Sequence, residues 1–490
     1  MKRPHWLLRR AVETPDAPAL ETESGTWTFA ELAGLARRAA ARVAAIARPG
    51  DAPIALLLPG GADFVVWLHG VSLAGRAVLP LNTRLTVPEL SSQLVDARVD
   101  CLLGEPDDPR LGELARQVPR LLACPAPSAA TLPAAAGKLP GDQFDPAATM
   151  AVLFTSGTSG RAKGACLSWG NFEASALAAA RRLGPCVGGR WLACMPLYHV
   201  GGLSILLRSV LFGGPVRLQA RFDVAAVSDA LDAGDIEALS LVPTMLSRLL
   251  THRAGRPAPA SLCVLLLGGA AAAPELVSRA LAAGFPVCPT YGLTETTSQV
   301  ATAAPPSGAA TTSPMLPLPG IDVRIIAGER DADAGLSGEI AVRGAVVMQR
   351  YLNDPVATAR AIRDGWLLTG DLGYLEANGA LHVLDRRIDL VVSGGENVYP
   401  AEVEAILLEH PAVAEAGVAG IPDADLGARV IAWIVTSPGA VSDAAALQDF
   451  CRGRLAGYKL PREFRFVDAL PRTGGGKLQR RLLARTGGNR

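Results

Sequence analysis

The sequence carries little charge and no excess of either sign. Charged residues make up 19% of its 490 residues, against about 25% in an average globular domain. The 47 Lys and Arg are balanced by 46 Asp and Glu, which argues against nucleic acid or an anionic membrane surface as a partner. Because hydrophobic residues reach 49%, the chain can build a large core and is not intrinsically disordered. A small-molecule partner is favoured.

Long apolar runs are missing as well. No uninterrupted stretch reaches the roughly 18 apolar residues that suggest a membrane span. The N-terminus begins with basic residues, but its apolar stretch covers only residues 6–8 and ends at Arg9. That stretch is too short for the core of a signal peptide. We therefore expect a cytoplasmic protein.

The eight cysteines form no C-x-x-C pair, so a zinc site or a redox motif of that type is not indicated. They are also too sparse for a disulfide scaffold. Free cysteine is among the most buried residue types and packs like a small hydrophobic residue. We expect all eight to be reduced thiols.

Apolar spacing predicts alternating helices and strands over the first 300 residues. Residues 27–47 have Ala, Leu and Val three and four apart, which predicts an amphipathic helix. Residues 54–82 indicate a strand, a glycine turn, a helix and a second strand, the pattern of a parallel sheet covered by helices. Residues 104–146 are rich in Pro, Ala, Asp and Gly and indicate a surface connection, and alternation resumes at residue 150.

From about residue 320 the pattern becomes shorter. Several stretches indicate β-ribbons joined by glycine-containing turns, and a helix is predicted directly after Pro400. We predict an α/β fold with β-ribbon elements, divided into a large domain over residues 1–385 and a small α/β domain over residues 386–490.

The segment TSGTSGRAKG, residues 155–164, is the strongest local signal. It follows an apolar strand and combines three glycines, four hydroxyl groups and two cations. Glycines allow backbone N–H groups to approach a phosphate chain, and Lys163 adds a donor. The segment is not a Walker A loop, because Gly164 follows the lysine where that motif has Ser or Thr.

Two carboxylates stand where a nucleotide could use them. Glu295, in TYGLTETTSQ, follows a strand-like segment, and open α/β sheets bind ligands at the carboxyl ends of their strands. It is well placed there for Mg²⁺. Asp371, in TGDLG, is predicted in a tight glycine-flanked turn that suits both hydroxyls of a ribose.

These motifs, together with LDRRIDLVVSGGENVYPAEVE and PRTGGGKLQR, occur in the order and spacing of the acyl-adenylate-forming ligases. The resemblance runs from about residue 10 to residue 485. It implies that a carboxylate attacks the α-phosphate of ATP to give acyl-AMP and pyrophosphate, and that a thiolate then displaces AMP. It also implies a small C-terminal domain that swings between the two steps.

The resemblance implies site residues as well. Lys477 is similar to the catalytic lysine of the family, with Thr158 at a phosphate and His199 beside the reacting carboxylate. Glu295 would bind Mg²⁺, while Asp371 and Arg386 would hold the ribose. The remaining nucleotide and coenzyme A positions implied are Thr155, Ser156, Gly157, Lys163, Gly269, Ala270, Tyr291, Gly292, Thr294, Gly394 and Gly395.

Arg208 bears on the acid substrate. It lies inside the otherwise apolar stretch LSILLRSVLFGG, nine residues after His199, and a buried guanidinium without a partner is very costly. It therefore needs an anion, either a protein carboxylate or a second carboxylate on the substrate. The surrounding MPLYHVGGLSILLRSV resembles the o-succinylbenzoate–CoA ligases of menaquinone biosynthesis, which implies Gly268 and Ser298 as further substrate contacts.

The predicted function is an ATP- and Mg²⁺-dependent acid–CoA ligase, with o-succinylbenzoate as the favoured acid. An aryl-CoA ligase for benzoate or anthranilate and an enzyme that loads a carrier protein remain alternatives. A luciferase-like oxygenase is more remote, and a non-enzymatic AMP-binding regulator would be expected to lack Glu295 or Lys477. The assembly is left open between a monomer and a homodimer.

Overall fold

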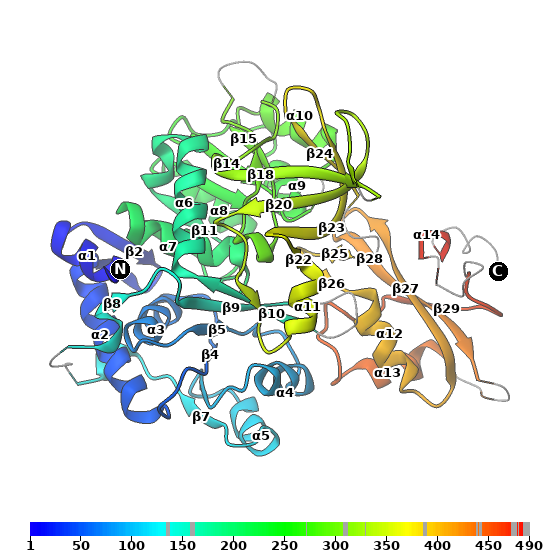
Figure 1. The fold of residues 1–490 in the computed structure, drawn as a ribbon, viewed down its shortest axis with the longest axis horizontal. Helices are drawn as coiled ribbons and strands as arrows, with labels where there is room; N and C mark the ends of the chain where they lie inside the picture. The colour runs from blue at the N-terminus through cyan, green and yellow to red at the C-terminus, as the bar shows by residue number, and fades with distance from the viewer. Residues whose placement is uncertain are drawn as a thin grey trace.

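The computed structural model describes residues 1–133, 138–156, 162–270, 272–306, 312–328, 330–385, 390–437, 440, 443–471, 478 and 480–483. Four predicted site residues, Gly157, Thr158, Arg386 and Lys477, lie outside this part of the chain, and of Ser156 only the backbone is described. In Figure 1 the N-terminal elements are blue to cyan, the central elements are green, and the C-terminal elements form an orange to red group at one side.

The first sheet has seven strands in the order β21-β10-β9-β5-β4-β6-β7, and its strands from β9 to the edge strand β7 are parallel. Its members are β4 (Ile54–Leu57), β5 (Val78–Pro80), β6 (Cys101–Gly104), β7 (Leu122–Pro125), β9 (Thr149–Ser156), β10 (Ala162–Ser168) and β21 (Arg350–Tyr351). The strand–helix–strand predicted over residues 54–82 is confirmed. The surface connection predicted over 104–146 is wrong in part, because it contains helix α5 (Arg110–Gln117) and edge strand β7.

The second sheet has nine strands in the order β17-β16-β15-β14-β13-β11-β12-β2-β3. Strands β2 to β15 along this order are parallel, so their carboxyl ends share one edge. The strands are β2 (Pro18–Thr22), β3 (Gly25–Thr28), β11 (Trp191–Ala193), β12 (Val216–Leu218), β13 (Ala238–Leu241), β14 (Val264–Leu267), β15 (Val287–Tyr291), β16 (Ala301–Thr302) and β17 (Leu316–Pro317).

Helices cover both sheets (Figure 1). They include α1 (Trp6–Glu13), α2 (Phe29–Ile46), α3 (Ala62–Leu73), α4 (Val87–Asp96), α6 (Trp169–Leu183), α7 (Val200–Phe212), α8 (Val224–Asp232), α9 (Pro243–Arg253) and α10 (Pro274–Ala282). The amphipathic helix predicted over residues 27–47 is α2, which begins at a capping box formed by Thr28 and Glu31. Helix α3 is buried along ten of its twelve residues, because α2 covers the face that would otherwise meet water.

The β-ribbons predicted after residue 320 are confirmed as a third, antiparallel sheet in the order β19-β18-β20-β23-β22, with β24 paired to β23. Its strands are β18 (Ile321–Ala327), β19 (Arg330–Asp331), β20 (Gly338–Gly344), β22 (Ile362–Arg363), β23 (Trp366–Leu375) and β24 (Leu381–Asp385), and helix α11 (Pro355–Ala361) precedes β22.

The C-terminal elements build a separate small core around one sheet in the order β26-β25-β28-β27, with β29 paired to β28. They are β25 (Val391–Ser393), β26 (Glu396–Val398), β27 (Val413–Asp423), β28 (Gly427–Thr436), β29 (Glu463–Phe466), α12 (Pro400–Leu408), α13 (Ala444–Cys451) and α14 (Arg480–Leu483). The helix predicted after Pro400 is α12, whose Val403 and Leu407 are fully buried. The proposed boundary between residues 385 and 386 stays a prediction.

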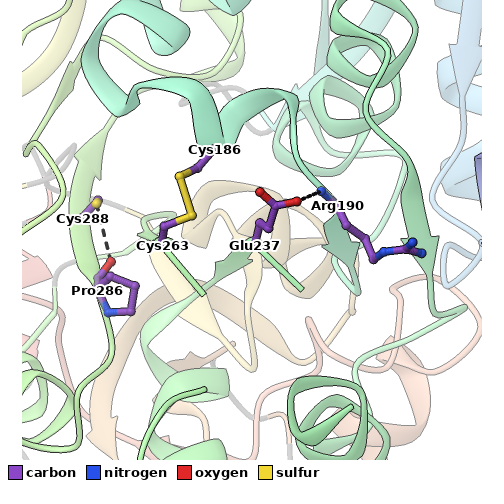
Figure 2. Close-up of a disulfide and its surroundings, with 6 residues drawn as sticks. All are labelled: Cys186, Arg190, Glu237, Cys263, Pro286 and Cys288. Atoms are coloured by element: carbon purple, nitrogen blue, oxygen red, sulfur yellow. Dashed lines mark hydrogen bonds between the residues drawn. A yellow bond between two sulfur atoms is a disulfide. The ribbon is translucent and has the colours of Figure 1, made fainter. Parts of the chain in front are cut away.

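The expectation of eight reduced cysteines is wrong for two of them. Cys186 and Cys263 form a disulfide across 77 residues, with Cα atoms 6.4 Å apart (Figure 2). Each lies just before a strand of the second sheet, Cys186 before β11 and Cys263 before β14. Only the fold brings these positions together, so cysteine spacing could not reveal the pair. The other six are free.

No helix in the described ranges is both long and apolar enough to cross a membrane.

Candidate active site

A cavity of roughly 260 Å³ lies where the carboxyl ends of β13, β14 and β15 meet the C-terminal elements. This is the edge at which open α/β sheets bind ligands. Eleven of the predicted site residues line it: Thr155, His199, Arg208, Gly268, Gly269, Gly292, Thr294, Glu295, Ser298, Asp371 and Gly395. Four other predicted residues are described but do not line it: Lys163, Ala270, Tyr291 and Gly394.

Glu295 lies in a short 3₁₀ turn, Thr294–Thr296, directly after β15. Its side chain is buried, and its Oε1 accepts hydrogen bonds from Tyr351 Oη at 2.8 Å and Thr155 Oγ1 at 3.4 Å. Lys163, on β10, packs against the Tyr351 ring, with its Nζ 5.4 Å from the ring centre. A carboxylate is thus fixed at the cavity wall, as the sequence predicted.

This carboxylate fits a magnesium ion that arrives with a nucleotide. Within the described ranges, no group of three or more His, Cys, Asp and Glu side chains could enclose a metal. Mg²⁺ bound to a nucleotide needs no such enclosure, because one or two carboxylates, phosphate oxygens and water complete its six ligands.

Gly292 lets the backbone fold tightly at the wall that Ser298 lines. An ideal Cβ on Gly292 would lie only 1.6 Å from the Ser298 carbonyl oxygen. No side chain fits at that distance. The glycine in the YGLTET motif is therefore required by the close approach of two backbone segments, which shapes the cavity beside Glu295.

Asp371 lies in the cavity wall, but the turn predicted around it is wrong. The residue belongs to strand β23, at a point where the pairing with β20 shifts register. Gly370, with φ of +75°, permits this bulge. Asp371 is buried and accepts a hydrogen bond of 2.8 Å from Tyr291 Oη. Tyr291 therefore acts behind the wall, where it orients the carboxylate.

Arg208 lies on α7 with its side chain 4% exposed and its guanidinium 4.7 Å from the Trp191 ring centre. Within the described ranges it makes no ion pair or hydrogen bond, and its Nη1 is buried without a partner. Burial lowers its pKa from 12.5 to about 10. The protein carboxylate that the sequence left open as a partner is not found in the described residues.

His199 precedes α7, and its Nε2 lies 3.0 Å from Glu396 Oε2. Tyr198 Oη donates to Glu396 Oε1 at 2.7 Å, and Arg84 Nη1 donates to the same oxygen at 3.2 Å. Burial alone would raise the pKa of Glu396, but the hydrogen bonds and charges of these three residues outweigh it and lower the pKa to about 2. Glu396 is therefore an anion at the cavity wall.

Glu396 is delivered by a tight hairpin. Strands β25 and β26 are joined by Gly394 and Gly395 alone, with φ of +60° and +84°. Two-residue hairpin loops favour glycine because both positions take positive φ. Gly395 packs against Val242 after β13, so the C-terminal hairpin meets the edge of the second sheet.

Sequence reasoning missed Glu396, Tyr198 and Arg84. Two of them stand next to residues that it did select, Tyr198 beside His199 and Glu396 beside Gly395. A buried, ionised glutamate leaves no local mark in sequence, and its partners are about 200 and 300 residues away. Arg84 carried no motif at all.

Residues 7–352 match the AMP-binding enzyme family, and residues 402–477 match the AMP-binding enzyme C-terminal domain. The 2-succinylbenzoate–CoA ligase of Geobacillus kaustophilus is 42% identical over 484 residues, 98% of this chain and 97% of that protein. The enzyme of the same name from Bacillus pumilus is 40% identical over 494 residues, 99% of each.

Two solved structures of o-succinylbenzoate CoA synthetase from Bacillus subtilis, each 38% identical and covering 99% of this chain and 98% of that one, are also similar. A double mutant bound to the product analogue OSB-NCoA superposes with a TM-score of 0.92. The complex with the acyl-adenylate intermediate OSB-AMP superposes with a TM-score of 0.74. At equal identity and coverage, the present structure therefore superposes more closely on the complex with the product analogue than on the complex with the acyl-adenylate.

The cavity therefore lies in a chain whose residues 7–352 and 402–477 match the two domains of one enzyme family. This chain belongs to the AMP-binding enzyme family.

Proposed function

We propose that this chain is an ATP- and Mg²⁺-dependent 2-succinylbenzoate–CoA ligase, acting in menaquinone biosynthesis. One observation carries the choice of acid: Arg208 is a buried cation at the cavity wall with no anionic partner among the described residues. An acid with two carboxylates supplies that anion and leaves the other carboxylate to react. The relatives that share this name support the assignment over the full length of the chain.

The first step joins the aliphatic carboxylate of the acid to the α-phosphate of ATP, with pyrophosphate as the leaving group. Magnesium bound at Glu295 would neutralise phosphate charge. Asp371, oriented by Tyr291, would accept the ribose hydroxyls. Lys477, which lies outside the described residues, is proposed to bridge the attacking carboxylate and the α-phosphate, where cations stabilise developing charge.

The second step transfers the acyl group to coenzyme A. The CoA thiolate attacks the acyl carbonyl of the mixed anhydride, the bond to the phosphate oxygen breaks, and AMP leaves. The hairpin at Gly394 and Gly395 borders the cavity from the C-terminal side, which supports its role beside the thiol channel. In this arrangement His199 is held by Glu396 at the same wall.

Helix geometry supports a substrate spanning His199 and Arg208. Nine residues of α-helix rise about 13.5 Å. Arg208 is the ninth of the thirteen residues of α7 and lines the same cavity as His199. An acid with carboxylates at opposite ends would reach both side chains. A monocarboxylate would leave the Arg208 guanidinium buried without an anion.

The experiment is thioester formation dependent on ATP and CoA, followed by mass spectrometry with 2-succinylbenzoate, benzoate, anthranilate, a cinnamate and a medium-chain fatty acid. Strong preference for 2-succinylbenzoate is expected. Equal or better use of a monocarboxylate would keep the ligase chemistry and refute the assigned acid. Transfer to a carrier protein but not to CoA would refute the thioester product.

Three further expectations stay predictions. The two-domain division at residues 385 and 386 predicts that limited proteolysis releases a small C-terminal fragment. A homodimer would be detected by light scattering. The cytoplasmic location follows from sequence arguments alone and is testable by fractionation of the native host.

A further inference from the structure

A buried lysine forms a second ion pair between the two parts of the chain, beside the same cavity. Lys459, in the segment before β29, is 5% exposed. Its Nζ donates to Glu402 Oε1 of α12 at 2.6 Å and to Glu89 Oε1 of α4 at 2.7 Å. Glu402 belongs to the C-terminal part, whereas Glu89 belongs to the first sheet's helical cover. One ammonium therefore bridges two carboxylates on opposite sides of the interface.

The geometry around Glu89 is built for this contact. Its Oε2 accepts hydrogen bonds from the backbone N–H and the hydroxyl of Thr86, at 2.8 and 2.7 Å, as the third residue of a capping box. One oxygen thus anchors the carboxylate to the start of α4, and the other points at Lys459. The positive end of the helix dipole also favours an anion there.

The rest of the segment follows the same interface. Thr86 Oγ1 lies 3.1 Å from the Arg454 carbonyl oxygen, and Asn82 Nδ2 donates to Tyr458 Oη at 3.2 Å. Ala456 is buried in the core cluster that contains the residues of α4 and β4. Segment 454–459 is therefore the surface by which the C-terminal part rests on α4.

Charge makes the bridge selective for this placement. Burial opposes the charged form of Lys459, but the two carboxylates outweigh it and raise its pKa. If the C-terminal part moved away from α4, Lys459 would keep Glu402 and lose Glu89. The placement in which the Glu89 contact is made superposes with a TM-score of 0.92 on the relative bound to OSB-NCoA.

We propose that Lys459 and Glu89 are positioning residues for thioester formation, holding the C-terminal part in the arrangement that admits CoA. The proposal rests on the ligase function proposed above. Glu89 lies outside the cavity wall, whereas Lys459 and Glu402 belong to it. A change at Glu89 therefore acts on the placement of the C-terminal part without removing a contact to a substrate.

The test replaces Glu89 by Gln, which keeps the side-chain size and the capping oxygen but removes the charge that faces Lys459. Glu31→Gln is the matched control. Glu31 holds the same capping-box position on α2, with its Oε2 2.8 Å from the Thr28 backbone nitrogen. Within the described ranges the Glu31 side chain forms hydrogen bonds only with Thr28 and none with the C-terminal part.

Two half-reactions are measured separately. Adenylation is followed by ATP–pyrophosphate exchange with 2-succinylbenzoate in the absence of CoA, and thioester formation by adding CoA to preformed acyl-adenylate. We expect Glu89→Gln to lower kcat/KM for CoA at least 10-fold with adenylation within twofold of wild type, because apparent affinity falls with the fraction in the competent arrangement. Glu31→Gln should change neither.

Equal loss in both half-reactions would mean that Glu89 supports only the fold and would overturn the proposal. Unchanged kcat/KM for CoA would overturn it as well. Lys459→Gln provides a second variant, expected to impair the same half-reaction. Absence of pyrophosphate exchange in the wild type would refute the proposed function itself, which separates that failure from failure of the bridge.

Discussion

Replacing Arg208 by Met should make the empty protein more stable and the enzyme much worse. The burial that lowers the Arg208 pKa from 12.5 to about 10 corresponds to about 3 kcal/mol, at ~1.4 kcal/mol per pKa unit. Methionine removes that penalty and keeps most of the volume, while the stack on Trp191 is lost at a cost of about 1 kcal/mol. The free energy of unfolding should rise by about 2 kcal/mol.

Activity should change in the opposite direction. Removing one partner of a buried ion pair costs roughly 3–5 kcal/mol, so kcat/KM for 2-succinylbenzoate should fall by at least about 100-fold. The matched substrate is 4-oxo-4-phenylbutanoate, which has the reacting carboxylate and lacks the one on the ring. For this acid the variant should lose little or gain. Coupled thioester assays measure kcat/KM of the wild type and the variant with both acids. Urea unfolding without ligand measures their free energies of unfolding.

Arg253→Met is the control. Arg253 is 3% exposed, as buried as Arg208, but its Nη1 donates to Asp232 at 2.8 Å and its Nη2 to the Pro257 carbonyl at 2.7 Å. Its loss should destabilise the protein by roughly 1–3 kcal/mol and leave the acid preference unchanged. If Arg208→Met instead destabilises like Arg253→Met, or penalises both acids equally, Arg208 is structural and the reasoning is refuted.

Three other changes test separate features. Burial lowers the pKa of His69 from 6.5 to about 4, so between these pH values the unfolded chain binds a proton at His69 that the folded chain does not. The free energy of unfolding should therefore fall by about 3 kcal/mol as the pH drops through that window. Urea titrations at pH 7 and pH 4 should show that His69→Leu removes this contribution. The Cys186–Cys263 disulfide closes a 77-residue loop, so its reduction should lower the free energy of unfolding by up to about 4 kcal/mol. Dithiothreitol should then lower the Tm of the wild type and leave the Tm of Cys263→Ser unchanged. Gly292→Ala should abolish adenylation or folding, because its Cβ would meet the Ser298 carbonyl; near-normal pyrophosphate exchange would show that this backbone can relax.

Much of the fold could be predicted because its signals are local. Helix α2 has both an apolar stripe and a capping box, and the first βαβ unit has buried strands bounded by glycine. Helix α5 was missed because only Leu111 and Leu114 face the core along its eight residues. Strand β7 was missed because it is an edge strand of four residues, none of them fully buried.

The positions of Gly292, Thr294 and Glu295 at the cavity were predictable for a different reason. Glu295, Gly292 and Thr294 follow one strand within a few residues, so a motif specifies their relative positions. Asp371 shows the limit of such a motif. A glycine at positive φ serves a turn and a β-bulge equally well, and the bulge in β23 was decided by pairing with β20, about 30 residues away.

The contacts between the two parts could not be predicted, because each depends on a placement and not on a segment. Arg84 meets Glu396, and Lys459 meets Glu89, so each part supplies one cation and one carboxylate to the other. Neither pair adds much net stability, because Arg84 is half-exposed to water and desolvation of Lys459 and Glu89 offsets most of their attraction. An interface fastened by such reciprocal pairs can separate at small cost when water solvates the freed charges, whereas an equally large apolar interface could not. If the C-terminal part moves during the reaction, as we propose, fastening it by charge, with few aliphatic contacts such as Ala456 across the interface, keeps the cost of that movement low.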